Sequence, residues 1–255
     1  MQKVLITGAA GFIGMHCSIR YIEEGWNVIG IDNLNDYYDV KLKKDRLECI
    51  KSKCKELNGG FEFINHDIDS EIWLKFEGHK FDLVIHLAAQ AGVRYSVENP
   101  LAYFRSNISG FQKVLDFVRL NNIKSFLYAS SSSVYGKTIS VPFKENDGCN
   151  EPESYYAASK KVNETLAYSY WKTYGVKSIG LRFFTVYGPW GRPDMAPFIF
   201  TKAAFLKQTI NVYNNGNQER DFTYIDDIIE SVFRISLNNS QIEKAMVVNV
   251  GNGSP

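Results

Sequence analysis

Tyr156 and Lys160 stand four positions apart and could perform acid–base chemistry on a substrate hydroxyl. They lie in the stretch ESYYAASKK, which begins at Glu153. At about 100° per residue they share one face of a helix, about 40° apart. Lys161 is turned by about another 100° from Lys160, and Tyr155 has a serine at the same four-residue spacing. Tyr156 and Lys160 are therefore the tyrosine–lysine pair of this stretch with the right geometry.

A tyrosine becomes a useful base only if its pKa falls well below its usual value of about 10. A fall of roughly 3 units corresponds to about 4 kcal/mol. One cation at about 5 Å, at an effective dielectric constant of about 20, contributes about 3 kcal/mol. We therefore expect Lys160 to lower the pKa of Tyr156 most of the way to neutrality, with a positively charged cofactor ring supplying the rest.

The alternative for this pair is an exposed tyrosine and lysine without chemistry, which is common on helix surfaces. A hydroxyl-rich turn, ASSSSVYG, favours the catalytic interpretation, because it follows the predicted strand Ser125–Ala129. Ser131 or a neighbouring serine could donate a hydrogen bond to the same substrate oxygen as the tyrosine.

A glycine-rich turn, TGAAGFIG, joins the first predicted strand to the first helix. Gly8 allows a tight turn, Gly11 lets the backbone approach a pyrophosphate, and Gly14 lets helix and strand pack closely. The helix N-terminus would then offer unpaired N–H groups to the phosphates. The spacing G-x-x-G-x-x-G also fits a plain tight turn, but its place at the first strand–helix junction favours a nucleotide.

Asp32 ends the second predicted strand, 24 residues after Gly8. Its carboxylate could accept both hydroxyls of an adenosine ribose and would repel a 2′-phosphate, which predicts NAD rather than NADP. The alternative is a turn-forming aspartate in IDNLND. Asp67 and the run Leu87-Ala88-Ala89 also follow predicted strands, where open α/β sheets bind ligands.

Short β-branched runs alternate with amphipathic helical patterns along the chain, which predicts a doubly wound parallel α/β sheet. The predicted strands of this part are Lys3–Thr7, Asn27–Ile31, Phe61–Asn65, Leu83–Leu87, Ser125–Ala129 and Lys177–Phe183. Two long helices are predicted over Leu101–Asn121 and Tyr156–Tyr174.

The regular alternation loosens after about Gly188, where prolines interrupt the chain. The elements predicted beyond it are a helix at Phe198–Leu206, strands at Ile210–Tyr213 and Asp221–Tyr224, a helix at Asp226–Leu237 and a strand at Met246–Val250. We expect residues 1–188 to form a dinucleotide-binding domain, to which the strand near 246–250 returns. Residues 189–255 would form a smaller, incomplete substrate-binding region, since the chain stops directly after a strand.

The composition favours small-molecule binding. The formal charge is +1, with acids and bases mixed along the chain, so neither nucleic acid nor an anionic membrane is an expected partner. The four cysteines form no C-x-x-C pair, which argues against a zinc site or a disulfide framework. No apolar run approaches 18 residues and no leader precedes the first strand, so we expect a cytoplasmic protein.

The sequence resembles the extended short-chain dehydrogenase/reductase family. The motifs that carry the resemblance are TGAAGFIG, HLAAQAGV, SSSSVYG, YAASK, RFFTVYGPWGRP and RDFTYIDD, in this order. GIDNLNDYYDVKLKKDRL and FFTVYGPWGRPDMA are similar to the branch of nucleotide-sugar 4-epimerases that act on UDP-glucuronate. The resemblance implies a Rossmann fold with NAD as a tightly held cofactor.

It also implies a mechanism. Tyr156 removes the proton of the sugar 4-hydroxyl while hydride leaves C4 for NAD, and the resulting 4-keto sugar turns over and takes the hydride back on its other face. Ser131 would supply the active-site hydroxyl, and Ser132 and Ser133 would lie against the sugar or cofactor. Related 4,6-dehydratases and decarboxylases carry acidic residues at these last two positions, so their absence favours epimerisation.

The remaining roles also come from the resemblance. Arg192 would face the sugar carboxylate, Arg220 would hold the diphosphate, Tyr213 would stack on uracil, and Thr185 would lie near the sugar and phosphates. Gln90 and Arg94 are substrate-binding candidates without a settled role. The further cofactor-binding residues are Ala10, Phe12, Ile13, Asn33, Ile68, Asn107, Ser130, Phe183 and Val186, with Tyr156 and Lys160 themselves.

Two alternative functions stay open. One is a 4-epimerase of UDP-glucose or UDP-N-acetylglucosamine, and the other is a silent NAD-binding sensor, against which the Tyr156–Lys160 pair argues. The two long helices resemble those that form a four-helix dimer interface in this family, which predicts a homodimer. UDP-galacturonate as product would suit synthesis of a surface polysaccharide.

Overall fold

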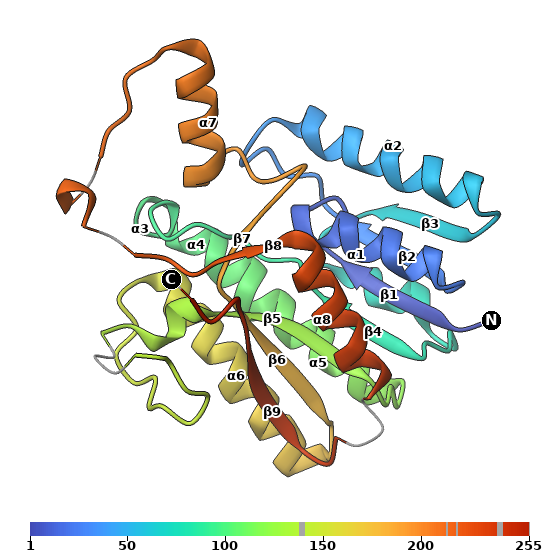
Figure 1. Ribbon diagram of the computed structural model, residues 1–255. Coiled ribbons are helices and arrows are strands. Elements are labelled where there is room, and N and C mark those ends of the chain that lie inside the picture. Colours follow the sequence, from blue (N-terminus) through green and yellow to red (C-terminus); the bar gives the residue numbers. More distant parts are fainter. Residues whose placement is uncertain (138–140, 213, 218, 239–241, 255) are drawn as a thin grey trace.

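The structure is a computed structural model that describes residues 1–137, 141–212, 214–217, 219–238 and 242–254. Its centre is a seven-stranded parallel sheet in the order β3-β2-β1-β4-β5-β6-β9 (Figure 1). The order reverses between β1 and β4, as in dinucleotide-binding sheets. The strands are β1 (Lys3–Thr7), β2 (Asn27–Asp32), β3 (Gly60–Asn65), β4 (Leu83–His86), β5 (Phe126–Ser131), β6 (Ser178–Phe183) and β9 (Ala245–Val250).

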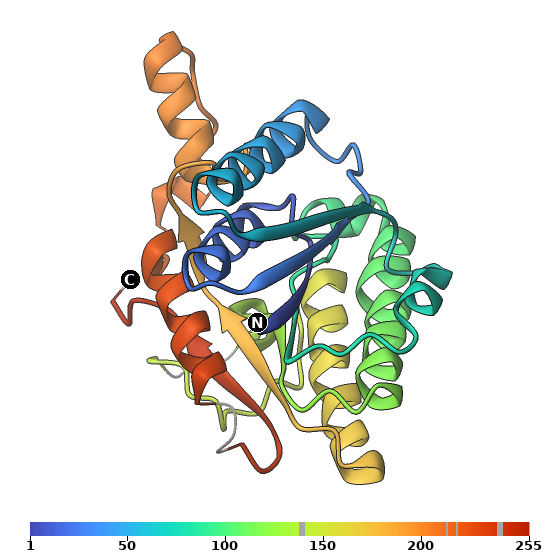
Figure 2. The ribbon, with the colours of Figure 1, turned by 90° about the vertical axis from the view of Figure 1, so that its right-hand side faces the viewer.

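Helices cover both faces of this sheet, so the predicted doubly wound architecture is confirmed (Figure 2). One face packs against α1 (Phe12–Glu23), α2 (Val40–Glu56) and α8 (Ile225–Leu237), and the other against η1 (Glu71–Phe76), α5 (Gly110–Leu120) and α6 (Tyr155–Tyr174). Successive residues of β1 alternate between the two cores, with Val4 and Ile6 in the first and Leu5 in the second. None of the described helices has the length and apolar character needed to cross a lipid bilayer.

The predicted helix over 101–121 contains a π-helical turn. It consists of α4 (Pro100–Tyr103), the π segment η2 (Phe104–Ser109) and α5, without a break in helical backbone angles at Phe104 or Gly110. The short helices α3 (Tyr95–Glu98) and η3 (Ser132–Tyr135) flank the site described below. Because π turns inside helices often mark functional sites, the position of Asn107 within η2 is informative.

The part of the chain after residue 184 contains a second, two-stranded sheet of β7 (Thr185–Tyr187) and β8 (Phe222–Tyr224). Between these strands lie α7 (Ala196–Leu206), which projects away from the sheet in both ribbon views, and the short η4 (Asn214–Gly216) (Figures 1 and 2). Apart from Ala203, the side chains of α7 are exposed or only partly buried. The predicted strand near 246–250 lies in the main sheet beside β6. The domain division at residue 188 stays a prediction.

The predicted strand over 210–213 is wrong for residues 210–212, which form no strand. These residues are half-buried or exposed. A β-branched run forms a strand only where a neighbouring strand can pair with its backbone groups. Tyr213 lies outside the described residues. Strand β7 was missed, since three residues are too few to give an alternating pattern.

Candidate active site

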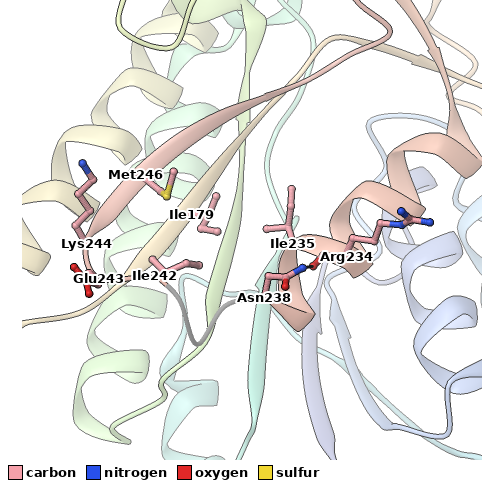
Figure 3. Close-up of a pocket in the computed structure, with 8 residues that line it drawn as sticks. All are labelled: Ile179, Arg234, Ile235, Asn238, Ile242, Glu243, Lys244 and Met246. Atoms are coloured by element: carbon pink, nitrogen blue, oxygen red, sulfur yellow. Dashed lines mark hydrogen bonds between the residues drawn. The ribbon is translucent and has the colours of Figure 1, made fainter.

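The predicted catalytic and cofactor-binding residues gather where strands β1, β2, β4, β5 and β6 end, on both sides of the reversal in strand order. A hollow of about 580 Å³ lies at the other end of the sheet, over Ile179 near the start of β6. Figure 3 shows Ile235 of α8 and Asn238, directly after that helix, on one side of it and Ile242 and Met246 on the other. Because none of the predicted site residues lines this hollow, it is separate from the candidate active site.

The glycine-rich turn has the backbone geometry that the sequence predicted. Gly8 has φ +74°, and a Cβ atom there would lie 2.7 Å from the backbone nitrogen of Ala88. A Cβ atom on Gly14 would overlap the carbonyl oxygen of Gly8, so α1 can cross this close to β1 only without a side chain. Of the neighbouring predicted residues, Phe12 is buried in the core and Ile13 packs against it.

The N-terminus of α1 is open to a ligand. No side chain caps it, whereas Asp39, Ser70 and Ser154 cap the N-termini of α2, η1 and α6. The first N–H groups of a helix have no partner within it, and they carry a partial positive charge. A pyrophosphate is a group that these N–H donors fit.

Asp32 lies buried between the turn and the following loop. Its Oδ2 accepts from the backbone N–H of Ala10 (3.2 Å) and its Oδ1 from that of Leu34 (2.9 Å). Lys43 of α2, which was not predicted, places Nζ 3.9 Å from Oδ1. Burial raises the pKa of Asp32 despite the charge of Lys43 and these hydrogen bonds. Each carboxylate oxygen keeps a second lone pair for a ribose hydroxyl.

Asn33 and Asp67, two predicted cofactor-binding residues from different loops, are brought together. Asn33 Nδ2 donates to Asp67 Oδ2 at 2.8 Å. Ile68 is buried in the core between the sheet and α5, so its side chain has a structural role. Residues 87–89 follow β4, and the backbone N–H of Leu87 and Ala88 donates to the carbonyl and hydroxyl oxygens of Thr7, respectively.

The side chain of Asn107 in the π turn binds protein groups. Its Oδ1 accepts from the backbone N–H of Gln90, and its Nδ2 donates to the Gln90 carbonyl (3.0 Å) and to Ser159 Oγ (2.9 Å). The carbonyl of Asn107 accepts from Asn163 of α6. Its predicted cofactor contact stays a prediction, and the contacts seen here fix the Gln90 loop against α6, the helix of Tyr156.

Tyr156 is half-buried at the start of α6, with its ring edge-on to Tyr103. Burial raises its pKa, while a hydrogen bond with Ser131 and the charge of Arg192 lower it. The prediction that Lys160 would be the main group lowering the pKa of Tyr156 is wrong in this structure. Burial lowers the pKa of Lys160 itself to about 7, so that lysine carries only part of a positive charge at neutral pH.

Lys160 is almost fully buried, and its Nζ donates to the carbonyl of Ala129 on β5 at 2.8 Å. Ser131, at the end of the same strand, accepts from the N–H of Ser133, which begins the turn η3 with Ser132. The helix carrying Tyr156 is thus tied to the strand carrying Ser131.

Ser130 is hydrogen-bonded to a buried ion pair that was not predicted from the sequence. Its Oγ donates to Glu164 Oε1 at 2.6 Å, and Arg182 of β6 binds both carboxylate oxygens of Glu164, from Nε at 2.8 Å and Nη2 at 2.9 Å. Glu164 continues the face of α6 that carries Tyr156 and Lys160. These contacts hold β5, β6 and α6 together directly beneath the site.

Arg192 lies in the turn between β7 and α7, and its charge reaches Tyr156 and lowers the pKa of that phenol. Its Nε and Nη2 bind Asp194 at 3.1 Å and 2.5 Å, and the hydroxyl of Tyr37 donates to the same carboxylate. The Arg192 and Asp194 side chains remain 22% and 29% exposed. The charge of this predicted arginine therefore reaches Tyr156, while Asp194 occupies one edge of its guanidinium.

The other predicted substrate residues are spread more widely. Thr185 lies on β7, next to the predicted cofactor-binding residue Val186 and just after another, the buried Phe183 that ends β6. Arg220 is exposed before β8, with its guanidinium on the carbonyl of Glu219. Arg94 is exposed at the start of α3. Their predicted roles stay predictions, and that of Tyr213 falls outside the described residues.

Residues missed by the sequence reasoning include Lys43, Arg46, Glu164 and Asp194. Lys43 and Arg46 lie in a run of charges on α2 that reads as a solvated face, yet both are buried. A four-residue spacing after Lys160 could have drawn attention to Glu164. Asp194 had no signal except its closeness to Arg192.

The chain matches a known family over nearly its whole length. The profile of the NAD dependent epimerase/dehydratase family covers residues 4–251. The chain belongs to this family. The predicted membership and the predicted kind of cofactor, NAD, are thereby confirmed.

Individual relatives show which members of this family the chain is similar to. Protein CapI of Staphylococcus aureus is 48% identical over 269 residues, covering 100% of this chain and 79% of that protein. UDP-glucuronate 4-epimerase 3 of Arabidopsis thaliana is 48% identical over 234 residues, 89% of this chain and 53% of that protein. The predicted similarity to UDP-glucuronate 4-epimerases is confirmed.

A solved structure agrees with these relatives. The crystal structure of UDP-glucuronic acid 4-epimerase from Bacillus cereus, in complex with UDP-glucuronic acid and NAD, matches with a TM-score of 0.88 at 33% identity. The match covers 98% of this chain and 77% of that chain. The family fold therefore extends through both sheets of the structure.

Proposed function

We propose that this protein is an NAD-dependent 4-epimerase that interconverts UDP-glucuronate and UDP-galacturonate through a transient 4-keto sugar. The observation that carries the proposal is a partly exposed guanidinium, Arg192, whose charge reaches Tyr156, in a chain similar to UDP-glucuronate 4-epimerases. A cation next to the catalytic hydroxyl is what an acidic sugar needs.

The residues present fit NAD. The uncapped N-terminus of α1 would hold the pyrophosphate, and Asp32 the adenosine ribose. When bound, NAD accepts a hydride from C4 of the sugar and returns it. Because the cofactor is restored in each cycle, it serves as a resident group and is not consumed.

Tyr156 would take the proton of the sugar 4-hydroxyl at its phenolic oxygen and return it to the same sugar oxygen once the hydride is back on C4 from the opposite face of the ring. Ser131, which shares a hydrogen bond with Tyr156, would hold the same oxygen. Arg192 and a cationic cofactor ring both favour the phenolate. Lys160, anchored to Ala129, adds a charge that grows as the pH falls through about 7.

The remaining edge of the Arg192 guanidinium would bind the sugar carboxylate. Asp194 holds Nε and Nη2, and the Arg192 side chain, whose guanidinium carries five N–H donors, is 22% exposed and can bind a further anion. Holding the carboxylate also opposes its loss as carbon dioxide, to which a 4-keto, 5-carboxylate sugar is prone. Ser132 and Ser133 carry no carboxylate with which to shift further protons, which favours epimerisation over dehydration.

A panel of UDP-sugars followed by NMR tests this function. With NAD-loaded protein we expect inversion at C4 of UDP-glucuronate, and slower or no inversion of UDP-glucose and UDP-N-acetylglucosamine. Arg192→Ala should lower kcat/KM for the acidic sugar about 100-fold while changing that for a neutral sugar less than 3-fold, because a charged hydrogen-bonded contact is worth about 1.5–3 kcal/mol. Conversion of UDP-glucose alone would refute the acidic substrate.

We also propose a cytoplasmic homodimer that serves surface polysaccharide synthesis. Supporting the dimer, large apolar side chains are exposed on the two long helices, namely Leu101, Phe104, Leu120, Tyr168 and Tyr174. Light scattering of the purified protein tests the dimer, and Phe104→Glu should give monomers. A wild-type protein that is monomeric at micromolar concentration would contradict it.

A further inference from the structure

The turn that leads to Arg192 is held by two side chains from the cofactor-binding helices. Arg46 of α2 donates from Nε and Nη2 to the carbonyl of Trp190, at 3.2 Å and 2.6 Å, and from Nη2 to that of Gly191 at 3.3 Å. His16 of α1 lies 3.1 Å from the carbonyl of Pro189 through Nε2. Three successive carbonyls of the turn are therefore bound from outside it.

The same guanidinium binds the cofactor side. Arg46 Nη1 donates to the carbonyl of Ala10 in the glycine-rich turn at 3.2 Å and to the hydroxyl of Tyr38 at 2.7 Å. Arg46 is fully buried, yet all these partners are carbonyl or hydroxyl oxygens. A buried cation is costly; the charge of Asp32, which acts on Arg46, and these five hydrogen bonds offset that cost and hold the guanidinium between the two turns.

The turn has a backbone that would not hold this shape unaided. Trp190 has φ +63°, which is unfavourable for a residue with a side chain, and Gly188 has φ +145°. A Cβ atom on Gly188 would lie 2.5 Å from Ile225. Because Trp190 and Gly191 directly precede Arg192, the bonds to their carbonyls determine where that side chain starts.

We propose that Arg46, assisted by His16, is a positioning residue that fixes the turn carrying Arg192 and so determines the preference for acidic sugars. Arg46 acts through the turn and touches neither the sugar nor the reacting atoms. The inference rests on the proposed function, because it assigns a determinant of the selectivity that Arg192 provides. It also links the glycine-rich turn to the sugar-binding turn through one side chain.

A double-mutant cycle tests the proposal. Arg46→Met and Arg192→Ala are made singly and together in the full chain, and kcat/KM is measured for UDP-glucuronate and UDP-glucose. We expect Arg46→Met to lower the acidic-to-neutral ratio about 10-fold, and to lower it by less than 2-fold more when Arg192 is already alanine. Arg234→Met, on the exposed surface of α8, is the matched control and should leave the ratio unchanged.

Two further measurements keep the proposal testable if Arg46→Met folds poorly. His16→Phe retains the ring against Phe12 and removes only the bond to Pro189, and we expect it to lower the ratio about 3-fold. Amide hydrogen exchange should be faster at Gly191 and Arg192 in both variants. Arg46→Lys should recover part of the ratio, because an ammonium can still bind a carbonyl.

The outcomes separate this inference from the proposed function. If Arg192→Ala changes the acidic-to-neutral ratio but Arg46→Met and His16→Phe lower kcat/KM equally for both sugars, the positioning role is overturned and the function stands. If Arg192→Ala leaves the ratio unchanged, both the acidic substrate and the positioning role are overturned. Unchanged hydrogen exchange in the turn of His16→Phe and Arg46→Met would also overturn the positioning role.

Discussion

Two arginines ten residues apart, Arg182 and Arg192, each bind a carboxylate through Nε and Nη2, but their surroundings differ. Arg182 is fully buried and pairs with Glu164, 6% exposed, which also holds Ser130. Arg192 pairs with Asp194 in a turn where both side chains remain 22% and 29% exposed. The first pair joins elements of the main sheet, and the second belongs to a turn beyond it.

The difference in burial determines what each pair can do. Burial lowers the pKa of Arg182, but the hydrogen bonds and charge of Glu164 outweigh it and raise the pKa overall. A buried ion cannot lose its partner without a large desolvation cost, whereas a partly exposed one can exchange its partner for another anion. The side of the site that carries Tyr156 and Glu164 is thus fixed, and the side that carries Arg192 can exchange its partner.

Tyr156→Phe should have the largest effect on activity, since it removes the hydroxyl group that we propose to be the base. We expect kcat to fall about 10⁴-fold, because a positioned acid–base group contributes about 10²–10⁴-fold. The fall is measured by NMR with UDP-glucuronate, and NAD content is measured by absorbance as the control. A variant that keeps more than a tenth of the activity would show that Tyr156 is not the base.

Glu164→Gln tests the rigidity of the buried pair. Removing one charge leaves Arg182 buried without its partner, so the free energy of unfolding should fall by about 3 kcal/mol. Burial raises the pKa of Glu164, and the hydrogen bonds from Arg182 and Ser130 lower it by more, which shows the strength of the contact. Urea denaturation measures the effect. A loss of unfolding free energy below about 1 kcal/mol would show that the buried Arg182–Glu164 pair stabilises the fold no more than the partly exposed Arg192–Asp194 pair.

Lys160 gives the fixed side a pH dependence of stability. Burial lowers its pKa from 10.5 to about 7, so between these values the unfolded chain binds more protons than the folded one. Stability should therefore rise with pH in that window, by at most about 1.4 kcal/mol per unit. Urea denaturation at pH 7.5 and 9 measures the slope. Lys160→Met should lack this contribution, and an equal slope in both proteins would contradict it.

Asp194→Asn should have the smallest effect on stability, below about 1 kcal/mol, because the pair it weakens is partly exposed. Freeing Arg192 from a competing carboxylate should lower KM for UDP-glucuronate about 3-fold and leave KM for UDP-glucose unchanged. Steady-state kinetics with both sugars measure the change. A higher KM for the acidic sugar would show that Asp194 orients Arg192 and does not compete for it.

Much of the fixed side could be predicted from local patterns. The alternation of strands and helices gave the sheet, since hydrophobic period and glycine spacing are properties of short segments. Tyr156 and Lys160 followed from helical spacing alone. Strand β7 was missed and the strand predicted at residues 210–212 was wrong, because pairing with a strand far along the chain decides whether such short segments form strands.

The sequence by itself determined the sheet, the glycine-rich turn and the four-residue spacing of Tyr156 and Lys160, because each depends on residues a few positions apart. Only the tertiary structure decided the charges around them. It buried Lys160 so that its pKa falls to about 7, and it brought the charge of Arg192 within reach of Tyr156. It also placed Arg46, 144 residues from Trp190, on the turn that leads to Arg192. Electrostatic effects depend on burial and on distance in space, which chain spacing does not contain.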